Sequence, residues 1–289
     1  MSRIFSTRFA KDLYRECQED KIFNSAAALA YYWMLSIFPA AIFLLSLLPY
    51  LPIPHLAEAI MHLLKQMLPG QAADLFTNVV QNVVSQKSGG VLSFGVLFSI
   101  WSASNGLYAI MQQLNTTYDL RETRPFWKVR GTALMLMLLF LTLIIGAFAL
   151  VVFGGVMQNW LAGLVGQNRV LLTFFSVFRW AVIICLLLLG LTLIYYFGPD
   201  TDHRLKLVSV GSVAGIGILI AASLAFQFYI TNFSNYSATY GSLGAVIILL
   251  LWFYVAGLAI LIGSEINALL EQYKAETRNA DKTGTRQGN

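Results

Sequence analysis

The chain has 289 residues, of which 57% are hydrophobic and only 11% are charged, whereas soluble domains average about 25% charged residues. Together with a mean hydropathy of +0.67, these values argue against a soluble globular domain, a disordered chain and a nucleic-acid-binding domain. They are typical of a helical protein that crosses a membrane several times.

Six apolar stretches are long enough to cross a bilayer, because a spanning helix needs about 20 mostly apolar residues. They lie at 26–49, 91–115, 132–157, 171–197, 207–230 and 241–269. Backbone groups in lipid must be satisfied within the segment, which favours helices, and the alternation typical of membrane β-strands is missing. We therefore predict an all-α polytopic membrane protein with six transmembrane helices.

The charged residues predict the orientation of these helices. All but Arg179 and Glu265 lie outside the six stretches, and 15 of the 19 Lys and Arg residues lie on the side of the two termini. By the positive-inside rule both termini are cytoplasmic, which also explains the isoelectric point near 9.2. We expect a multi-pass protein of the bacterial inner (plasma) membrane.

This topology divides the chain into three parts. Residues 1–25 form a cytoplasmic amphipathic segment, 26–269 form the six-helix transmembrane domain, and 270–289 form a polar cytoplasmic tail predicted to lack regular structure.

Apolar side chains recur at every fourth position of the N-terminal segment, at Phe5, Phe9, Leu13 and Cys17. Such a stripe is typical of a helix. Two placements remain open: the helix lies on the cytoplasmic face of the membrane, or it packs on the helical bundle.

In the first span, Tyr32 shares a helix face with Ser36 and Pro39, and Pro39 is expected to kink the helix. The first outer loop, 50–90, contains two runs of apolar residues at helical spacing, separated by Pro69-Gly70. We predict an amphipathic helical hairpin there, which either caps the bundle or roofs a cavity.

Polar residues also lie inside the second and fifth spans. Asn105 and Gln112 are seven residues apart and share one face of the second span, and Gln227 lies in the fifth. Such side chains either line a cavity or form hydrogen bonds between helices. Gly211 and Gly215 in the fifth span form a small-xxx-small pair, which favours close helix packing.

Arg179 lies about eight residues inside the fourth span. A charge at such a depth costs at least about 2.5–3.5 kcal/mol unless it is paired or hydrated. Three interpretations remain open: the side chain binds an anionic substrate group, pairs with a carboxylate, or extends outward to the headgroups.

Glu265 lies about five residues from the cytoplasmic end of the sixth span. It either forms a proton or cation site or pairs with a basic side chain of the inner loops, such as Arg124 or Arg130. The outer loop before this span, 231–240, is uncharged and rich in hydroxyl, amide and aromatic groups. It lies at headgroup level or enters a protein-lined cavity.

Soluble-enzyme chemistry is poorly supported. The three His residues are scattered, and no Walker A, GxSxG, HExxH or GxGxxG motif stands in a suitable context. We therefore predict no enzymatic activity, no cofactor, no metal site and no nucleic-acid partner.

Several segments together resemble one family, and their order and spacing are more specific than any single motif. They are Ala27–Tyr32, Ser36–Pro39, Trp101–Ser104, Leu114-Asn115, Arg124–Trp127, the run from Arg179-Trp180 to Tyr195 and Pro199, Tyr240–Ala245, Trp252–Tyr254 and Gly263–Ala268. Over about residues 20–272 the chain resembles the YihY/BrkB family of bacterial inner-membrane proteins.

The resemblance implies a six-span protein of a family labelled as BrkB-like virulence factors or transporters. Some members carry the label ribonuclease BN. This sequence does not support that label, because a zinc-dependent nuclease of that kind needs an HxHxDH-type cluster that three scattered His residues cannot supply.

We predict a transporter or translocator of lipid or anionic solute, with membrane lipids as partners and an anionic lipid or solute as substrate. The alternative is a non-transporting envelope scaffold or partner-binding membrane protein. Oligomeric state is left open. The candidate substrate- or ion-binding residues are Arg179, Glu265, Asn105, Gln112, Gln227 and Tyr32.

Overall fold

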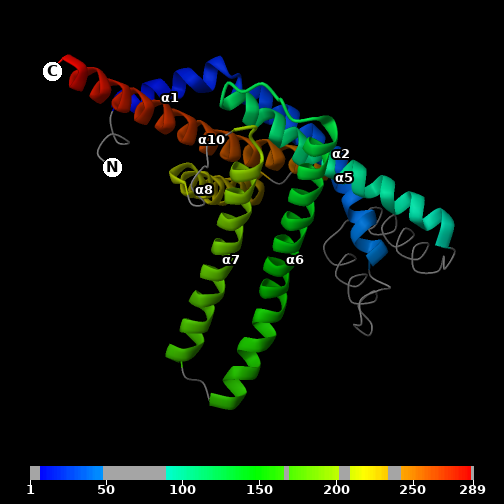
Figure 1. Ribbon diagram of the computed structural model, residues 1–289. Coiled ribbons are helices and arrows are strands. Elements are labelled where there is room, and N and C mark those ends of the chain that lie inside the picture. The colour runs from blue at the N-terminus through cyan, green and yellow to red at the C-terminus, as the bar shows by residue number, and fades with distance from the viewer. Residues whose placement is uncertain (1–6, 48–88, 166–168, 202–208, 234–241, 288–289) are drawn as a thin grey trace. The chain divides into compact units, whose positions relative to one another are not determined.

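The structure is a computed structural model that describes residues 7–47, 89–165, 169–201, 209–233 and 242–287. Within these ranges all regular structure is helical, which confirms the predicted all-α class (Figure 1). The helices are α1 (Thr7–Glu19), α2 (Ile22–Leu47), α5 (Gly89–Thr117), α6 (Phe126–Val165), α7 (Arg169–Phe197), α8 (Val210–Phe233) and α10 (Ser242–Gln287).

Each of the six predicted apolar stretches coincides with a helix, in the order α2, α5, α6, α7, α8 and α10. Among the described residues, segments in the last four of these helices are long and apolar enough to cross a membrane. They are Phe126–Ala147, Val170–Phe197, Val210–Tyr229 and Val246–Thr277. Helix α2 contributes a shorter apolar segment, Ile22–Ile37.

Large apolar side chains remain exposed along these helices. On α7, Phe174 is 68% exposed, Phe178 57% and Trp180 52%. A soluble monomer rarely exposes contiguous apolar surface on this scale. These faces are therefore suited to contact with lipid.

Contacts divide the chain into two compact units. The first unit comprises Met1–Phe23, Met111–Ile220 and Leu258–Asn289, and the second comprises Asn24–Ile110 and Ala221–Gly257. Both charges within the apolar stretches, Arg179 and Glu265, lie within the first unit.

In the first unit, α6 and α7 run side by side (Figure 1). A glycine of α7 lets them approach, because an added Cβ at Gly190 would lie 3.3 Å from Leu143 Cδ1 and 3.6 Å from Phe140 Cδ2. This packing fixes which residues of α6 face α7.

Helices α8 and α10 approach each other at backbone distance. An added Cβ at Gly211 would lie 2.0 Å from the carbonyl oxygen of Gly263, and one at Gly215 would lie 3.3 Å from that of Ala259. The predicted small-xxx-small contact is therefore confirmed, and its partner is α10.

The predicted N-terminal helix is present as α1, and its apolar stripe faces α10. Phe9 is buried against Ile266 and Leu269, and Leu13 packs on the same cluster. The hydroxyl of Tyr273 also donates a hydrogen bond to Asp12. Phe9, Leu13 and Cys17 therefore pack on the protein, which is the second of the two predicted placements. Phe5 lies outside the described residues.

Other features differ from expectation or lie outside the described residues. Helix α10 continues to Gln287, although the tail 270–289 was predicted to lack regular structure. The tail is rich in Ala, Glu, Lys, Arg and Gln, which favour helix and lengthen α10.

The predicted hairpin at 50–90 and most of loop 231–240 lie outside the described residues, and Pro39 lies inside α2.

Candidate functional site

Arg179 lies on α7 where that helix passes Gly154 of α6. An added Cβ at Gly154 would lie 2.4 Å from Arg179 Cδ and 2.8 Å from its Nη1. No larger residue could stand at position 154 without displacing the arginine side chain. The glycine therefore provides the space in which the guanidinium lies between two apolar helices.

The Arg179 guanidinium is incompletely partnered. Its Nε is buried and has no hydrogen-bond partner among the described residues. Its Cζ lies 5.9 Å from the centre of the Trp180 ring, a distance at which a cation is attracted to the ring face. A guanidinium is a planar set of donors that matches a carboxylate or a phosphate. Its chemistry therefore suits an anionic ligand.

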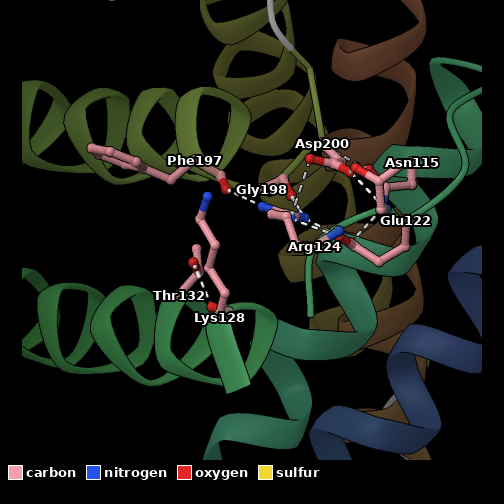
Figure 2. Close-up of polar contacts among 9 residues, drawn as sticks. Asn115, Glu122, Arg124, Lys128, Thr132, Phe197, Gly198 and Asp200 are labelled. Carbon is pink, nitrogen blue, oxygen red and sulfur yellow. Dashed lines mark hydrogen bonds and ion pairs between the residues drawn. The ribbon is translucent and has the colours of Figure 1, made fainter. Parts of the chain in front are cut away.

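A second polar site centres on Arg124, in the connection between α5 and α6 (Figure 2). Its Nε and Nη2 each donate to one oxygen of Glu122, both at 2.7 Å. Its Nη2 also donates to the carbonyl of Gly198 at 2.9 Å, and its Nη1 to that of Phe197 at 3.3 Å. A cation at the last carbonyls of α7 complements the negative end of the helix dipole.

Asn115 and Asp200 complete this network, which we call the arginine clamp: Asn115, Glu122, Thr123, Arg124, Phe197, Gly198 and Asp200. Asn115 donates to Glu122 at 2.9 Å and accepts from the Asp200 backbone N–H at 2.8 Å. Asp200 accepts from the Thr123 hydroxyl at 2.6 Å and lies 3.5 Å from Arg124 Nε. The clamp joins the end of α5, the start of α6 and the end of α7.

The clamp holds its carboxyls in the charged form. Hydrogen bonding from Arg124 lowers the pKa of Glu122 from its usual value, and hydrogen bonding from Thr123 lowers that of Asp200. Hydrogen bonding to Glu122 in turn raises the pKa of Arg124. Arg124 is one of the two basic residues named above as partners for Glu265. In the structure it forms ion pairs with Glu122 and Asp200 instead.

Glu265 lies on α10, where only 2% of the residue is exposed. Its carboxyl and that of Asp20 act on each other electrostatically, and we call these two residues the carboxyl pair. Asp20 is the first residue after α1. The next residue, Lys21, has a φ of 51°, and the chain turns there before α2 begins at Ile22. Burial is the main cause that raises the pKa of Asp20 above its usual value.

Unpartnered polar atoms surround the carboxyl pair. The Thr117 side chain at the end of α5 acts on Glu265. Both Thr117 Oγ1 and Glu265 Oε1 are nevertheless buried without a partner of hydrogen-bond geometry in the described part of the chain. Cys17 and Tyr118 also interact electrostatically with Glu265, and burial raises the pKa of Cys17 to about 11.

Asn267, one turn beyond Gly263, holds the N-terminus of α8. It accepts a hydrogen bond from the Gly211 N–H at 2.7 Å and donates to Ser209 Oγ at 2.8 Å. Ser209 Oγ in turn accepts from the N–H of Ser212 at 3.1 Å, as a helix-capping serine does. Sequence reasoning did not single out Asn267 or Asp20, because neither is a charge inside an apolar stretch.

The second unit contains three of the predicted candidates, Tyr32 on α2, Asn105 on α5 and Gln227 on α8. Tyr32 is 42% exposed, Gln227 is also exposed and Asn105 is half-buried. In the same unit Trp33 Nε1 donates to the Gly106 carbonyl at 3.2 Å. This bond joins α2 to α5.

The other three candidates, Arg179, Glu265 and Gln112, lie in the first unit. Gln112 is exposed on α5. Arg179 lies against α6, whereas Glu265 lies against the turn that follows α1. Arg179 and Glu265 therefore lie in separate polar sites of this unit, and the arginine clamp is a third.

The long apolar helices, with two charges placed within them, define a helical membrane protein. More particularly, the chain belongs to the family described as virulence factor BrkB, which matches residues 13–287. The resemblance predicted from the sequence is thus confirmed.

Two relatives illustrate this membership. The chain is 38% identical to the "ribonuclease-like protein YfkH" of Bacillus subtilis over 92% of its own length and 96% of that protein. It is 25% identical to a "UPF0761 membrane protein" of Xanthomonas campestris pv. campestris, over 94% of its own length but only 63% of that longer relative. No solved structure matches the chain significantly. Among the described residues, no three His, Cys, Asp or Glu residues are grouped so that they could hold a metal ion.

Proposed function

We propose that this protein is a six-span transporter of the bacterial inner membrane that moves an anionic lipid or an anionic solute, with Arg179 as the residue that binds the anion. The observation that carries the proposal is the Arg179–Gly154 contact. Within the apolar segment Val170–Phe197, the Arg179 Nε is buried there and has no hydrogen-bond partner among the residues that the structure describes. A charge at such a place is costly and typically serves function.

The six-span topology is part of this proposal, with 1–25 and 270–289 in the cytoplasm and 26–269 in the membrane. In this topology the end of α5, the start of α6 and the end of α7 lie on the cytoplasmic side. The arginine clamp supports this arrangement because it links these three places. The packing of α1 on α10 supports it as well, because Phe9 of the N-terminal segment lies against Ile266 and Leu269, close to the end of the predicted sixth span.

The anion is proposed to bind through the donors of the Arg179 guanidinium. A phosphate or carboxylate can accept two parallel hydrogen bonds from this planar group, which a lysine ammonium cannot reproduce. Lipid headgroups and free anions share this chemistry. The proposal involves no catalytic step, so the ribonuclease-like name of the Bacillus subtilis relative is not extended to this chain.

Flux through proteoliposomes tests the proposal. The probes are a fluorescent phosphatidylglycerol, whose movement between leaflets is followed by chemical quenching, and radiolabelled inorganic phosphate. We expect wild-type protein to move one of the two. Arg179→Gln should reduce that flux by about tenfold or more, because a hydrogen bond to a charged group contributes roughly 1.5–3 kcal/mol. Arg179→Lys should retain part of the flux.

The matched control is Arg15→Gln, which removes an arginine whose side chain is 61% exposed on α1. It should leave the flux unchanged. The proposal fails if wild-type protein moves neither probe, or if Arg179→Gln and Arg15→Gln move it equally well.

A further inference from the structure

We propose that the anion that binds Arg179 is the phosphate group of an anionic phospholipid, and that this lipid approaches from the bilayer along the flank of α7 that carries Trp180. The inference names the substrate class of the site described above, and its transport step rests on the proposed function. Its binding step does not depend on transport, so the two steps can fail separately.

Arg179 lies on the line along which α6 and α7 meet (Figure 1), which we call the seam. Contacts across the seam each have a glycine on one side: Arg179 with Gly154, Leu186 with Gly146, and Leu143 with Gly190. The residue numbers rise on α7 as they fall on α6, so the two helices are antiparallel. Leu186 and Gly190 follow Arg179 by about two and three helical turns, which places all three on the α7 face that meets α6.

The seam is apolar between Arg179 and the end of α7, as far as these contacts describe it. Leu186 faces Gly146 there, and Leu143 and Phe140 lie against Gly190. A free phosphate ion that moved along this line would lose its water among hydrocarbon groups, which is costly for a charge. A phospholipid brings its headgroup to the guanidinium while its acyl chains stay in the bilayer. The seam therefore favours a lipid over a soluble anion.

The position of Arg179 along α7 points to a lipid of the outer leaflet. Arg179 lies nine residues from Val170 and 18 from Phe197, which corresponds to about 14 Å and about 27 Å along the helix. In the proposed topology Val170 is at the outer end. The guanidinium therefore lies in the outer half of a hydrocarbon core about 30 Å thick, and an arginine can extend its head towards the nearer headgroups.

The guanidinium is turned towards one flank of α7. Its Cζ lies 5.9 Å from the centre of the Trp180 ring, and Ile184, one turn further along, lies on the same flank. Trp180 is 52% exposed and Ile184 43%. Arg179 itself is half-buried, so part of it can be reached from this flank. A donor group beside exposed apolar side chains matches a headgroup phosphate with an attached acyl chain.

The charge of Arg179 also favours a lipid over a second copy of the chain on this flank. In a symmetric dimer the same patch of both subunits meets. Contact through the Trp180 flank would therefore bring two guanidinium groups towards each other, in surroundings where like charges repel strongly. An anionic headgroup supplies the opposite charge, and its acyl chains cover the apolar side chains.

The binding step is tested by fluorescence on the full chain in vesicles, without a transport assay. The probes are phosphatidylglycerol or phosphatidylcholine with brominated acyl chains, at equal content in unlabelled phosphatidylcholine, and iodide in the water. The signal of Trp180 is the difference between wild-type protein and Trp180→Phe. We expect brominated phosphatidylglycerol to quench this signal severalfold more strongly than brominated phosphatidylcholine, and iodide to leave it almost unchanged.

Two variants probe the cause of the preference. Arg179→Gln should abolish it, because the neutral amide no longer attracts an anionic headgroup, whereas Arg15→Gln should keep it. The matched control for the flank is Phe178→Trp in the Trp180→Phe protein. Phe178 is 57% exposed and, as the residue before Arg179, lies on the opposite flank. A tryptophan there should be quenched equally by the two lipids.

Three results from wild-type protein and Trp180→Phe overturn the binding step, even if Arg179→Gln fails to fold. Equal quenching by the two lipids shows no anionic site. Quenching by iodide shows a water-filled cavity. A signal that no probe quenches shows that protein covers the flank.

The transport step is tested in the proteoliposomes described above. Wild-type protein should move phosphatidylglycerol and leave inorganic phosphate at background. Movement of phosphate, alone or beside the lipid, overturns the assignment of the substrate to lipids and leaves the proposed transport function standing. If neither probe moves, the transport function fails, while the quenching of Trp180 still decides whether the lipid binds.

Discussion

Gly154 and Arg179 are matched to each other across the α6–α7 contact, because an added Cβ at Gly154 would lie 2.4 Å from Arg179 Cδ. The nearest atoms belong to a long, flexible side chain and not to the backbone. A small residue at position 154 therefore sets where the guanidinium lies, while the helices themselves can stay in place.

Gly154→Ala is expected to displace Arg179 without removing its charge. The added methyl occupies the position of the arginine side chain, so flux of the transported probe should fall severalfold while the unfolding temperature changes little. Proteoliposome flux and thermal unfolding measure the two effects. Gly163→Ala on the same helix is the control, because an added Cβ there meets nothing within 4 Å. Equal flux in the two variants would contradict a positional role for Gly154.

Arg124→Ala is expected to destabilise the protein by about 2–3 kcal/mol, because it removes several charge-assisted hydrogen bonds from a side chain that is only 10% exposed. Glu122 and the last carbonyls of α7 would lose their donor. Unfolding by denaturant in detergent measures the change. Lys128→Ala, which removes an exposed basic side chain near the clamp, should cost less than 0.5 kcal/mol by the usual range for surface substitutions. Similar losses in both variants would contradict the clamp.

Acid should weaken the clamp. Hydrogen bonds lower the pKa values of Glu122 and Asp200 in the folded chain. Their stabilising contribution is therefore present above the usual carboxyl values, about 3.9 for Asp and 4.3 for Glu, and is lost as the pH falls through the lowered folded values. The unfolding temperature should drop in this acidic range, and Asp200→Asn should reduce the drop. An undiminished drop in Asp200→Asn would contradict the assignment.

The helices after α1 could be predicted because each contains a long apolar run bounded by charged or turn-forming residues, and α1 could be predicted from its apolar stripe. The contact of Gly211 and Gly215 could also be predicted, since two small residues four positions apart leave one face of a helix open to close approach. Which helix occupies that face could not be predicted. The structure supplies α10, through Gly263 and Ala259.

The polar sites were less accessible to sequence reasoning. Arg179 and Glu265 stand out because a charge inside an apolar run is costly. Their neighbours do not stand out: Gly154 is one of 22 glycines, and Asp20 lies in a segment with many charges. The clamp joins Asn115 to Asp200, 85 residues apart, and no local periodicity encodes such a pairing. Its members follow from the packing of α5, α6 and α7.

Gly211→Ala is expected to be the most damaging of the small substitutions, because the added Cβ would lie 2.0 Å from the Gly263 carbonyl oxygen and 2.5 Å from Asn267 Oδ1. A backbone oxygen cannot rotate aside, so α8 and α10 would have to separate. Overpacking of this kind costs about 1–3 kcal/mol, occasionally more. It would also disturb the hydrogen bond from Gly211 N–H to Asn267.

Gly217→Ala on the same helix is the matched control, since an added Cβ there meets nothing within 4 Å. Alanine has a higher helix propensity than glycine, so this variant should unfold at the same temperature as wild-type protein or slightly above it. Thermal unfolding in detergent compares the two. If Gly211→Ala proves as stable as Gly217→Ala, α8 and α10 do not meet at backbone distance, and the hydrogen bond from Gly211 N–H to Asn267 does not depend on a glycine at position 211.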